Sequence, residues 1–112
     1  MYNIKTLNEI SPVYAQVLNM SDYNVAADCA DPDAIIVRSA DMHAYEKNPN
    51  LMAVGRAGAG YNNIPVARMG KEGVVVFNAP GANANAVKEL AVAALLLASR
   101  DILGAIEWCG TL

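Results

Sequence analysis

The sequence predicts an α/β protein built on a doubly wound, parallel sheet. Short segments of strand character alternate along the chain with segments of helical periodicity, which is the pattern of parallel strands joined by helices. Residues 34–37 form an unbroken apolar run, as expected for a parallel strand that is buried on both faces. The chain has 112 residues, of which 54% are hydrophobic and 17% charged, so it can form one compact core but not a two-domain enzyme.

The first predicted elements are a strand, a helix and two further strands. Residues 2–7 alternate between the two faces of a strand, as a half-buried strand does. Ser11 and Pro12 provide an N-cap followed by proline at the first helical position, and apolar residues then recur at helical spacing. A second, weaker strand is expected at residues 23–27, before the apolar strand at 34–37.

The same alternation continues through the middle of the chain. A helix is expected at residues 41–47, and a strand at residues 51–54 leads into a glycine-rich segment. A short helical turn at residues 66–69 ends at Gly70. Residues 74–77 are the clearest strand, because three β-branched residues in series are bounded on both sides by turn residues.

The last predicted element is one uninterrupted helix at residues 85–103, with Asn83 or Asn85 as its N-cap. It is apolar around most of its circumference, so it needs cover on several sides. A five-stranded sheet covers one side, and we expect a second domain or a second subunit on the other. The alternative is a central helix wrapped by its own small domain. Residues 104–112 show no periodicity and are expected to be a linker.

Charge, cysteine content and hydropathy exclude several classes of protein. The 8 basic and 11 acidic residues give a net charge of −3, which argues against nucleic acid as the main partner. Cys29, Cys109 and the single histidine, His43, form neither a disulfide framework nor a zinc site. His43 falls in a predicted helix without an identified carboxylate partner and is interpreted as a surface or helix-capping residue. The longest apolar window, residues 90–98, is too short to cross a membrane, and we expect a cytoplasmic protein.

A glycine cluster follows the strand at residues 51–54. Gly58, Ala59 and Gly60 begin like the dinucleotide fingerprint G-x-G-x-x-G, but Asn63 stands in place of the third glycine. Asn78 stands where an acidic residue should bind the ribose. The segment is therefore interpreted as a loop that can adopt positive φ, whose backbone N–H groups form a nest for a carboxylate or phosphate.

Two arginines support an anion site. Arg38 and Arg56 each follow a predicted strand directly, and ligands of open α/β sheets bind at the carboxyl ends of the strands. Guanidinium groups pair with carboxylate and phosphate in bidentate fashion, so the pattern favours a small molecule with two or three negative charges. The alternative is that each arginine caps a strand end and pairs with a nearby acid: Asp33, Asp41 or Glu46.

Several motifs, in order and spacing, resemble the D-3-phosphoglycerate dehydrogenases, which belong to the D-isomer-specific 2-hydroxyacid dehydrogenases. The resemblance runs from about residue 34 to residue 100, and the combination of ordered motifs is specific although each alone is weak. The motifs are AIIVRS at 34–39, VGRAGAGYNNI at 54–64, GVVVFNAPGAN at 73–83, AVKEL at 86–90 and LASR at 97–100.

The resemblance implies a flavodoxin-like, substrate-binding domain at residues 1–84 and a crossover helix at residues 85–104. Residues 105–112 would begin the linker or cofactor domain, and the Rossmann cofactor domain would be missing. The chain would then be the amino-terminal part of an NAD-dependent enzyme that oxidises 3-phospho-D-glycerate to 3-phosphohydroxypyruvate in serine biosynthesis. Because the family's catalytic residues come from the cofactor domain, the chain itself would contain none and be inactive. A homo-oligomer through the last helix is also expected.

The resemblance further implies two groups of substrate-binding residues. The group that would contact the substrate phosphate is Arg38, Ser39 and Asn83. The group that would face the substrate carboxylate is Arg56, Gly58, Ala59 and Gly60, and Ala59 would also approach the cofactor. Two alternatives remain open: a free-standing, flavodoxin-like module that binds a phosphorylated carboxylic acid, and part of another D-2-hydroxyacid dehydrogenase, such as one acting on glycerate or lactate.

Overall fold

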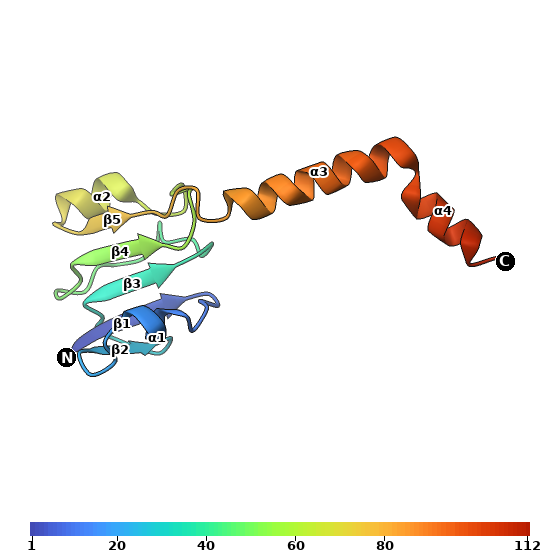
Figure 1. Ribbon diagram of the computed structural model, residues 1–112. Coiled ribbons are helices and arrows are strands. Elements are labelled where there is room, and N and C mark those ends of the chain that lie inside the picture. Colours follow the sequence, from blue (N-terminus) through green and yellow to red (C-terminus); the bar gives the residue numbers. More distant parts are fainter. The chain divides into compact units, whose positions relative to one another are not determined.

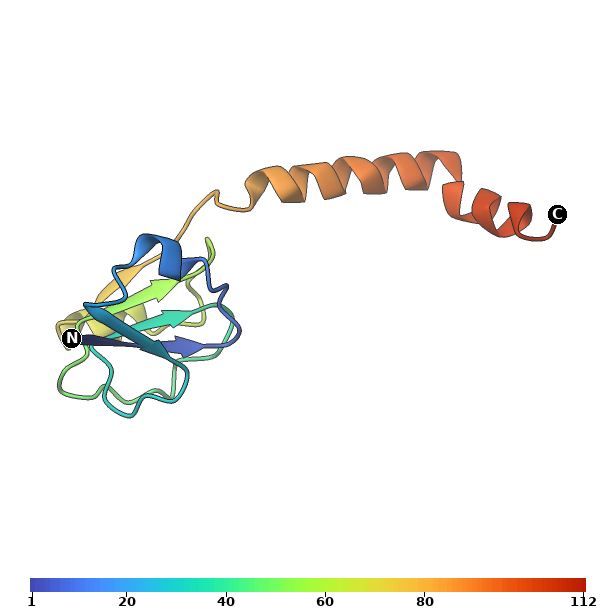
Figure 2. The same cartoon turned by 60° about the horizontal axis from the view of Figure 1, so that its bottom comes forward.

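A computed structural model describes all 112 residues, which divide into two compact units, Met1–Pro80 and Gly81–Leu112 (Figure 1). The first unit contains one five-stranded, entirely parallel sheet with strand order β2-β1-β3-β4-β5 (Figure 2). This is the order of flavodoxin-like folds, which confirms the predicted fold class. The strands are β1 (Tyr2–Leu7), β2 (Tyr23–Ala26), β3 (Ala34–Val37), β4 (Ala53–Arg56) and β5 (Val75–Phe77).

One face of the sheet carries the hydrophobic core. Ile35 pairs in register with Val54, and Val37 is buried beside them on the same face. The helix α2 (Val66–Lys71) covers this face through Met69, which is fully buried. The core cluster consists of Ile35, Val37, Met42, Leu51, Val54, Ile64, Met69 and Val74.

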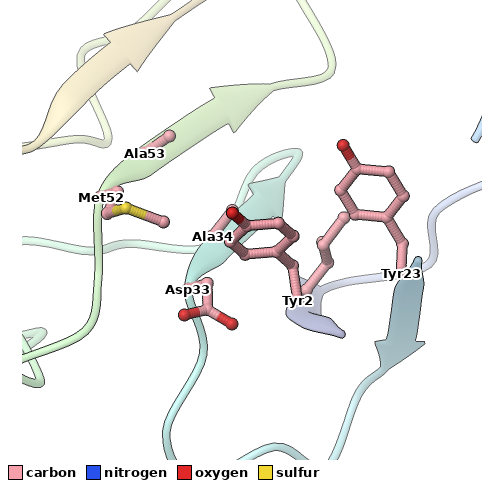
Figure 3. A pocket seen from close by; sticks show the side chains of 7 residues that line it. Tyr2, Tyr23, Asp33, Ala34, Met52 and Ala53 are labelled. Atoms are coloured by element: carbon pink, nitrogen blue, oxygen red, sulfur yellow. The ribbon is translucent and has the colours of Figure 1, made fainter.

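The opposite face of the sheet is only partly covered. The helix α1 (Tyr14–Val17) is short and buries none of its residues. Val75 and Phe77 are 53% and 59% exposed on this face. Near the start of the strands, Tyr2 and Tyr23 stack with ring centroids 6.0 Å apart beside a shallow pocket (Figure 3). The prediction that residues 34–37 are buried on both faces is therefore wrong, because burial alternates along β3.

The predicted helix at residues 41–47 is absent. Only a single turn forms there, with the Tyr45 N–H donating to the Met42 carbonyl at 3.0 Å, because the Met42 N–H donates to the carbonyl of the distant Asn63 at 2.8 Å. Met42 is thereby turned into the core, where it is fully buried. The strand expected at residues 51–54 lies two positions later, so Arg56 is the last residue of β4. The helix expected to end at Gly70 continues to Lys71.

The second unit consists of α3 (Ala84–Arg100) and α4 (Ile102–Cys109). The prediction of one helix over residues 85–103 is wrong, because Asp101 adopts the left-handed conformation with φ 44° and breaks it. Its carboxylate accepts the Gly104 N–H and so caps α4, which replaces most of the expected linker at residues 104–112. All side chains of α3 are exposed. No helix of the structure has the length and apolar character needed to span a bilayer.

Candidate functional site

Three loops meet at the carboxyl edge of the sheet, where β1, β3 and β4 end. Leu7, Val37 and Arg56 lie at the same level in the strand register, so the residues that follow them are neighbours in space. Asn8 follows β1. Residues 38–40, named here the Arg38 turn, follow β3. Residues 57–63, named the glycine loop, follow β4.

Asn8 holds the Arg38 turn from the side of β1. Its amide oxygen, Oδ1, accepts the backbone N–H groups of Arg38, Ser39 and Ala40 at 3.4, 2.9 and 2.8 Å. The residue itself adopts a positive φ of 72°, which asparagine tolerates better than most residues. The backbone amides of the Arg38 turn are thus occupied, and only its side chains remain for a ligand.

The two arginines leave the sheet on opposite faces. Arg56 pairs in register with Val37 and shares its face, the core face. Its Nε donates a hydrogen bond to the backbone carbonyl of Arg38 at 2.8 Å. The Arg38 side chain instead lines a pocket of about 420 Å³ together with Ile36 and Ala57. The guanidinium groups therefore lie near separate parts of the edge, and together they suit a ligand with two anionic groups rather than one.

Neither arginine is engaged by an acidic side chain. The structure contains one ion pair, between His43 Nδ1 and Asp41 Oδ1 at 2.8 Å. Arg38 and Arg56 thus pair with none of the acids considered as alternative partners. Glu9 lines the same pocket as Arg38 but makes no ion pair with it. The guanidinium of Arg38 and the hydroxyl of Ser39 have no hydrogen-bond partner in the fold, which leaves both free for an anion.

The glycine loop differs from its predicted conformation. Neither Gly58 nor Gly60 adopts a positive φ, so the predicted nest of left-handed residues is absent. Gly60 instead leaves space for the Arg56 guanidinium, because a Cβ at this position would lie 2.5 Å from Arg56 Nη1. The Asn78 side chain and the Ala79 N–H hold the loop through the carbonyls of Ala59 and Gly58, at 2.8 and 2.9 Å.

Two backbone donors of the glycine loop remain free. The N–H groups of Ala59 and Gly60 make no hydrogen bond within the fold, whereas the N–H of Gly58 is bonded to the carbonyl of Arg56 at 2.9 Å. A carboxylate placed beside the Arg56 guanidinium could accept from these two amides. The prediction of an anion site at the loop therefore depends on these two free donors and not on left-handed glycines.

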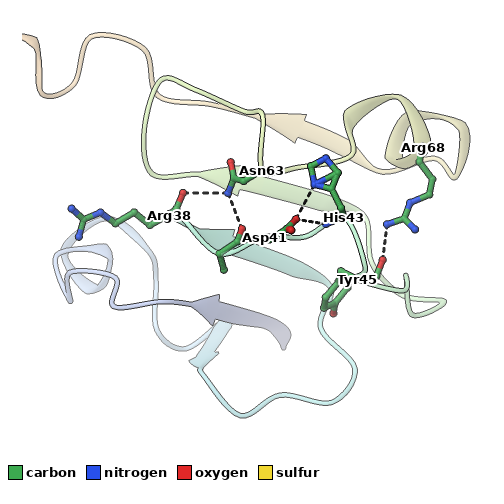
Figure 4. Close-up of polar contacts among 7 residues, drawn as sticks. Arg38, Asp41, His43, Tyr45, Asn63 and Arg68 are labelled. Atoms are coloured by element: carbon green, nitrogen blue, oxygen red, sulfur yellow. Dashed lines mark hydrogen bonds and ion pairs between the residues drawn. The ribbon is translucent and has the colours of Figure 1, made fainter.

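Asn63 links the glycine loop to the Arg38 turn (Figure 4). Its Nδ2 donates to the carbonyls of Ala40 and Arg38, at 2.8 and 3.4 Å. Sequence reasoning treated Asn63 only as a missing glycine and did not consider Asn8. For Asn8 a usable signal was its position directly after the first strand, at the ligand-binding edge, whereas Asn63 lies at the far end of the glycine loop and has no such signal.

The other predicted residues lie outside this cluster. Asn83 belongs to the second unit, where it occupies the N-cap position of α3 without a side-chain hydrogen bond. Its contact with a substrate phosphate stays a prediction. His43 lies in a turn rather than a helix, and it does have a carboxylate partner, Asp41, although both are largely exposed. Burial raises the pKa of Tyr45 above its usual value, with smaller contributions from Cys29 and Asp31.

The residues of this chain do not fit a dinucleotide-binding site. In such sites the glycine turn opens directly into a helix whose N-terminus receives the pyrophosphate. Here α2 begins only at Val66, after Pro65, and has six residues. Asn63 and Asn78 both use their side chains to fasten loops. We therefore assign no step of hydride transfer to these residues.

Comparison with known proteins places the chain in a family. The family model described as "D-isomer specific 2-hydroxyacid dehydrogenase, catalytic domain" matches residues 2–106. The chain therefore belongs to the D-isomer specific 2-hydroxyacid dehydrogenase family. The resemblance noted from the sequence motifs is confirmed.

The most similar relatives include D-3-phosphoglycerate dehydrogenases. The chain is 33% identical over 102 residues to the enzyme from Methanocaldococcus jannaschii, covering 88% of this chain and 19% of the relative. It is 40% identical over 73 residues to a hydroxypyruvate reductase of Thermotoga maritima, covering 62% of this chain and 24% of the relative. The chain thus spans about a fifth of the length of these relatives.

A solved structure shares the fold. A cofactor (NAD+)-bound 3-phosphoglycerate dehydrogenase of Entamoeba histolytica superimposes with a TM-score of 0.67 and 24% sequence identity. The superposition covers 86% of this chain and 38% of that structure. At this identity the similarity supports the fold alone.

Proposed function

We propose that the chain is the substrate-binding part of an NAD-dependent enzyme that oxidises 3-phospho-D-glycerate to 3-phosphohydroxypyruvate in serine biosynthesis. The observation that carries the proposal is the pair of separate arginine groups at the carboxyl edge of the sheet, neither of which is paired with an acidic side chain. Such a pair suits a ligand that has a phosphate at one end and a carboxylate at the other. The names of several relatives, D-3-phosphoglycerate dehydrogenase, support the same substrate.

The proposed contacts form two groups, one that binds the phosphate and one that binds the carboxylate. Arg38 and Ser39 bind the phosphate through the guanidinium and the hydroxyl, with Asn83 assisting. The carboxylate is bound by the Arg56 guanidinium and by the backbone of Gly58, Ala59 and Gly60, where Ala59 and Gly60 have the free N–H groups. Ala59 also faces the cofactor of the whole enzyme. These residues orient C2 of the substrate and contribute to rate by positioning it.

This assignment gives each segment of the chain a role in the whole enzyme. Residues 1–84 form the substrate-binding domain, residues 85–104 the crossover to the cofactor domain, and residues 105–112 the start of the region beyond it. The cofactor domain of the whole enzyme would hold NAD, which would supply the hydride-acceptor chemistry. Because the family's catalytic residues come from the cofactor domain, we expect the chain alone to be inactive. Its two free cysteines are in keeping with a cytoplasmic setting.

A second candidate function is that of a D-2-hydroxyacid dehydrogenase acting on a substrate without phosphate. It is favoured by the 40% identity to a hydroxypyruvate reductase. This function would use the carboxylate-binding side of the edge and leave Arg38 and Ser39 without a ligand. The free-standing binding module remains the third possibility.

The test is a titration of the isotope-labelled chain, followed by NMR, with 3-phospho-D-glycerate and D-glycerate. We expect the phosphorylated ligand to bind more tightly, and Arg38→Ala to weaken it at least about tenfold, a loss of about 1.4 kcal/mol. D-glycerate binding should be unchanged in that variant. Lys71→Ala, which removes an exposed positive charge at the end of α2, is the control.

Each alternative has its own outcome in this experiment. Equal affinity for the two ligands, unaltered by Arg38→Ala, would favour the second candidate function. Submicromolar binding of 3-phospho-D-glycerate without NAD would favour the free-standing module, whereas binding weaker than about millimolar fits half of a site shared with the cofactor domain. No binding of either ligand would refute the proposed site.

We also propose that the chain forms a homo-oligomer through α3. Leu90 and Leu95 are 72% and 70% exposed on this helix, and such apolar surfaces commonly mark contact sites.

A further inference from the structure

Asn63 occupies the position at which the dinucleotide fingerprint has its third glycine. In this chain its side chain spans two loops that are far apart in sequence. Nδ2 donates to Ala40 O at 2.8 Å and to Arg38 O at 3.4 Å. The backbone carbonyl of Asn63 accepts the N–H of Met42 at 2.8 Å, which makes a further bond between the same two segments.

The carbonyl of Arg38 is the common point of these contacts. It accepts from Asn63 Nδ2 and, at 2.8 Å, from Arg56 Nε. Asn63 and Arg56 therefore lie together against the Arg38 turn, one from within the glycine loop and one from the strand that leads into it. A shift of Asn63 would change the spacing between the Arg38 side chain and the Arg56 guanidinium.

Core packing does not account for the amide of Asn63. Its Oδ1 is buried and has no hydrogen-bond partner, which costs stability. A leucine of similar size would avoid this cost and keep the volume filled. The amide contributes its N–H donors, and these go to the turn that carries Arg38 and Ser39.

We infer that Asn63 is a positioning residue, which sets the distance between the Arg38 turn and the Arg56 guanidinium for a ligand that reaches both. The inference rests on the proposed function. A positioning role predicts different effects on two classes of ligand, whereas a purely structural role predicts the same effect on both. A ligand with two anionic groups depends on the spacing of the two sides, whereas a ligand with one carboxylate depends on the glycine loop and Arg56 alone.

The experiment compares 3-phospho-D-glycerate and D-glycerate on the full chain by NMR titration. The variants are Asn63→Leu, which keeps the side-chain volume and removes the donors, and Asn63→Ala, which removes both amide atoms. Asn62→Ala is the control, because Asn62 is the exposed neighbour in the same loop. We expect both Asn63 variants to weaken 3-phospho-D-glycerate at least about tenfold and D-glycerate less than about twofold, with the control binding like the unaltered chain.

A double-mutant cycle adds a second readout. If Asn63 acts through the Arg38 turn, Asn63→Leu should cost little further affinity for 3-phospho-D-glycerate in an Arg38→Ala background. Full additivity of the two changes would overturn the inference. Equal weakening of both ligands would do the same, since it indicates a general structural role. If neither Asn63 variant gives the dispersed spectrum of a folded protein, Asn63 is structural and the inference is wrong.

The outcomes separate this inference from the proposed function. If the unaltered chain binds 3-phospho-D-glycerate and Asn63→Leu binds it equally well, the inference alone fails. If the unaltered chain binds neither ligand, the proposed function fails and the positioning role fails with it.

Discussion

Gly60 shows how a single missing side chain shapes the candidate site. Its backbone leaves space for Arg56 Nη1, which a Cβ would approach to 2.5 Å. We predict that Gly60→Ala displaces the guanidinium while the chain stays folded, because the end of an arginine side chain can move. D-glycerate binding, measured by NMR titration, should fall by about tenfold, or about 1.4 kcal/mol. Gly70→Ala is the matched control, since no atom lies within 4 Å of a Cβ built there. Equal binding by the two variants would contradict this role of Gly60.

Asn8 determines the conformation of the Arg38 turn by local hydrogen bonds. Asn8→Ala removes the acceptor of three N–H groups and places alanine at a φ of 72°. We predict a loss of roughly 2 kcal/mol in the free energy of unfolding, measured by urea denaturation. Asn8→Asp keeps a side-chain oxygen at the Oδ1 position as the acceptor and should retain most of the stability.

A control for Asn8 is available on the neighbouring strand. Asn24 is exposed and makes one side-chain hydrogen bond, to Asn3 at 3.2 Å. Asn24→Ala should cost well under about 1 kcal/mol. If Asn8→Ala is no more destabilising than Asn24→Ala, the three hydrogen bonds do not stabilise the turn.

Individual elements were predictable to different degrees. The five strands were found because alternation and β-branched runs are local signals, and each lies within two residues of its expected position. The helix predicted at residues 41–47 is absent from the structure, because the Met42 N–H bonds to the carbonyl of the distant Asn63 and the Met42 side chain is buried in the core. Whether this segment is helical depends on which side chains cover the sheet, and the local sequence pattern carries no information about that.

The break between α3 and α4 depends on one residue. Asp101 has a φ of 44° and caps α4 through Gly104. We predict that Asp101→Ala joins the two helices, because alanine disfavours the left-handed conformation and provides no cap. The far-ultraviolet circular dichroism should show more helix. Asp101→Asn, which tolerates this conformation and can cap, should keep the break, and an unchanged spectrum in Asp101→Ala would argue against the explanation.

On the scale of the whole molecule, exposed apolar surface is the main feature. The chain exposes the apolar side chains of α3 and also Val75 and Phe77 on the sheet. We predict self-association through α3, seen in sedimentation experiments as an average mass that rises with concentration. Leu90→Lys together with Leu97→Lys, on one side of the helix, should reduce it. Lys88→Ala should not, and a monomer at every concentration would disprove the proposed oligomer.

The amino-acid sequence alone predicted the α/β class and the edge of the sheet at which Arg38 and Arg56 lie. It could do so because strand periodicity is local and because the carboxyl ends of parallel strands meet at one edge. The construction of that edge depends on long-range contacts, in which the Arg38 carbonyl accepts from Arg56 Nε and Asn63 Nδ2 and the Arg38 N–H donates to Asn8 Oδ1. Those contacts join residues 18 to 30 positions apart, and separations of that length leave no periodic signal in a single sequence.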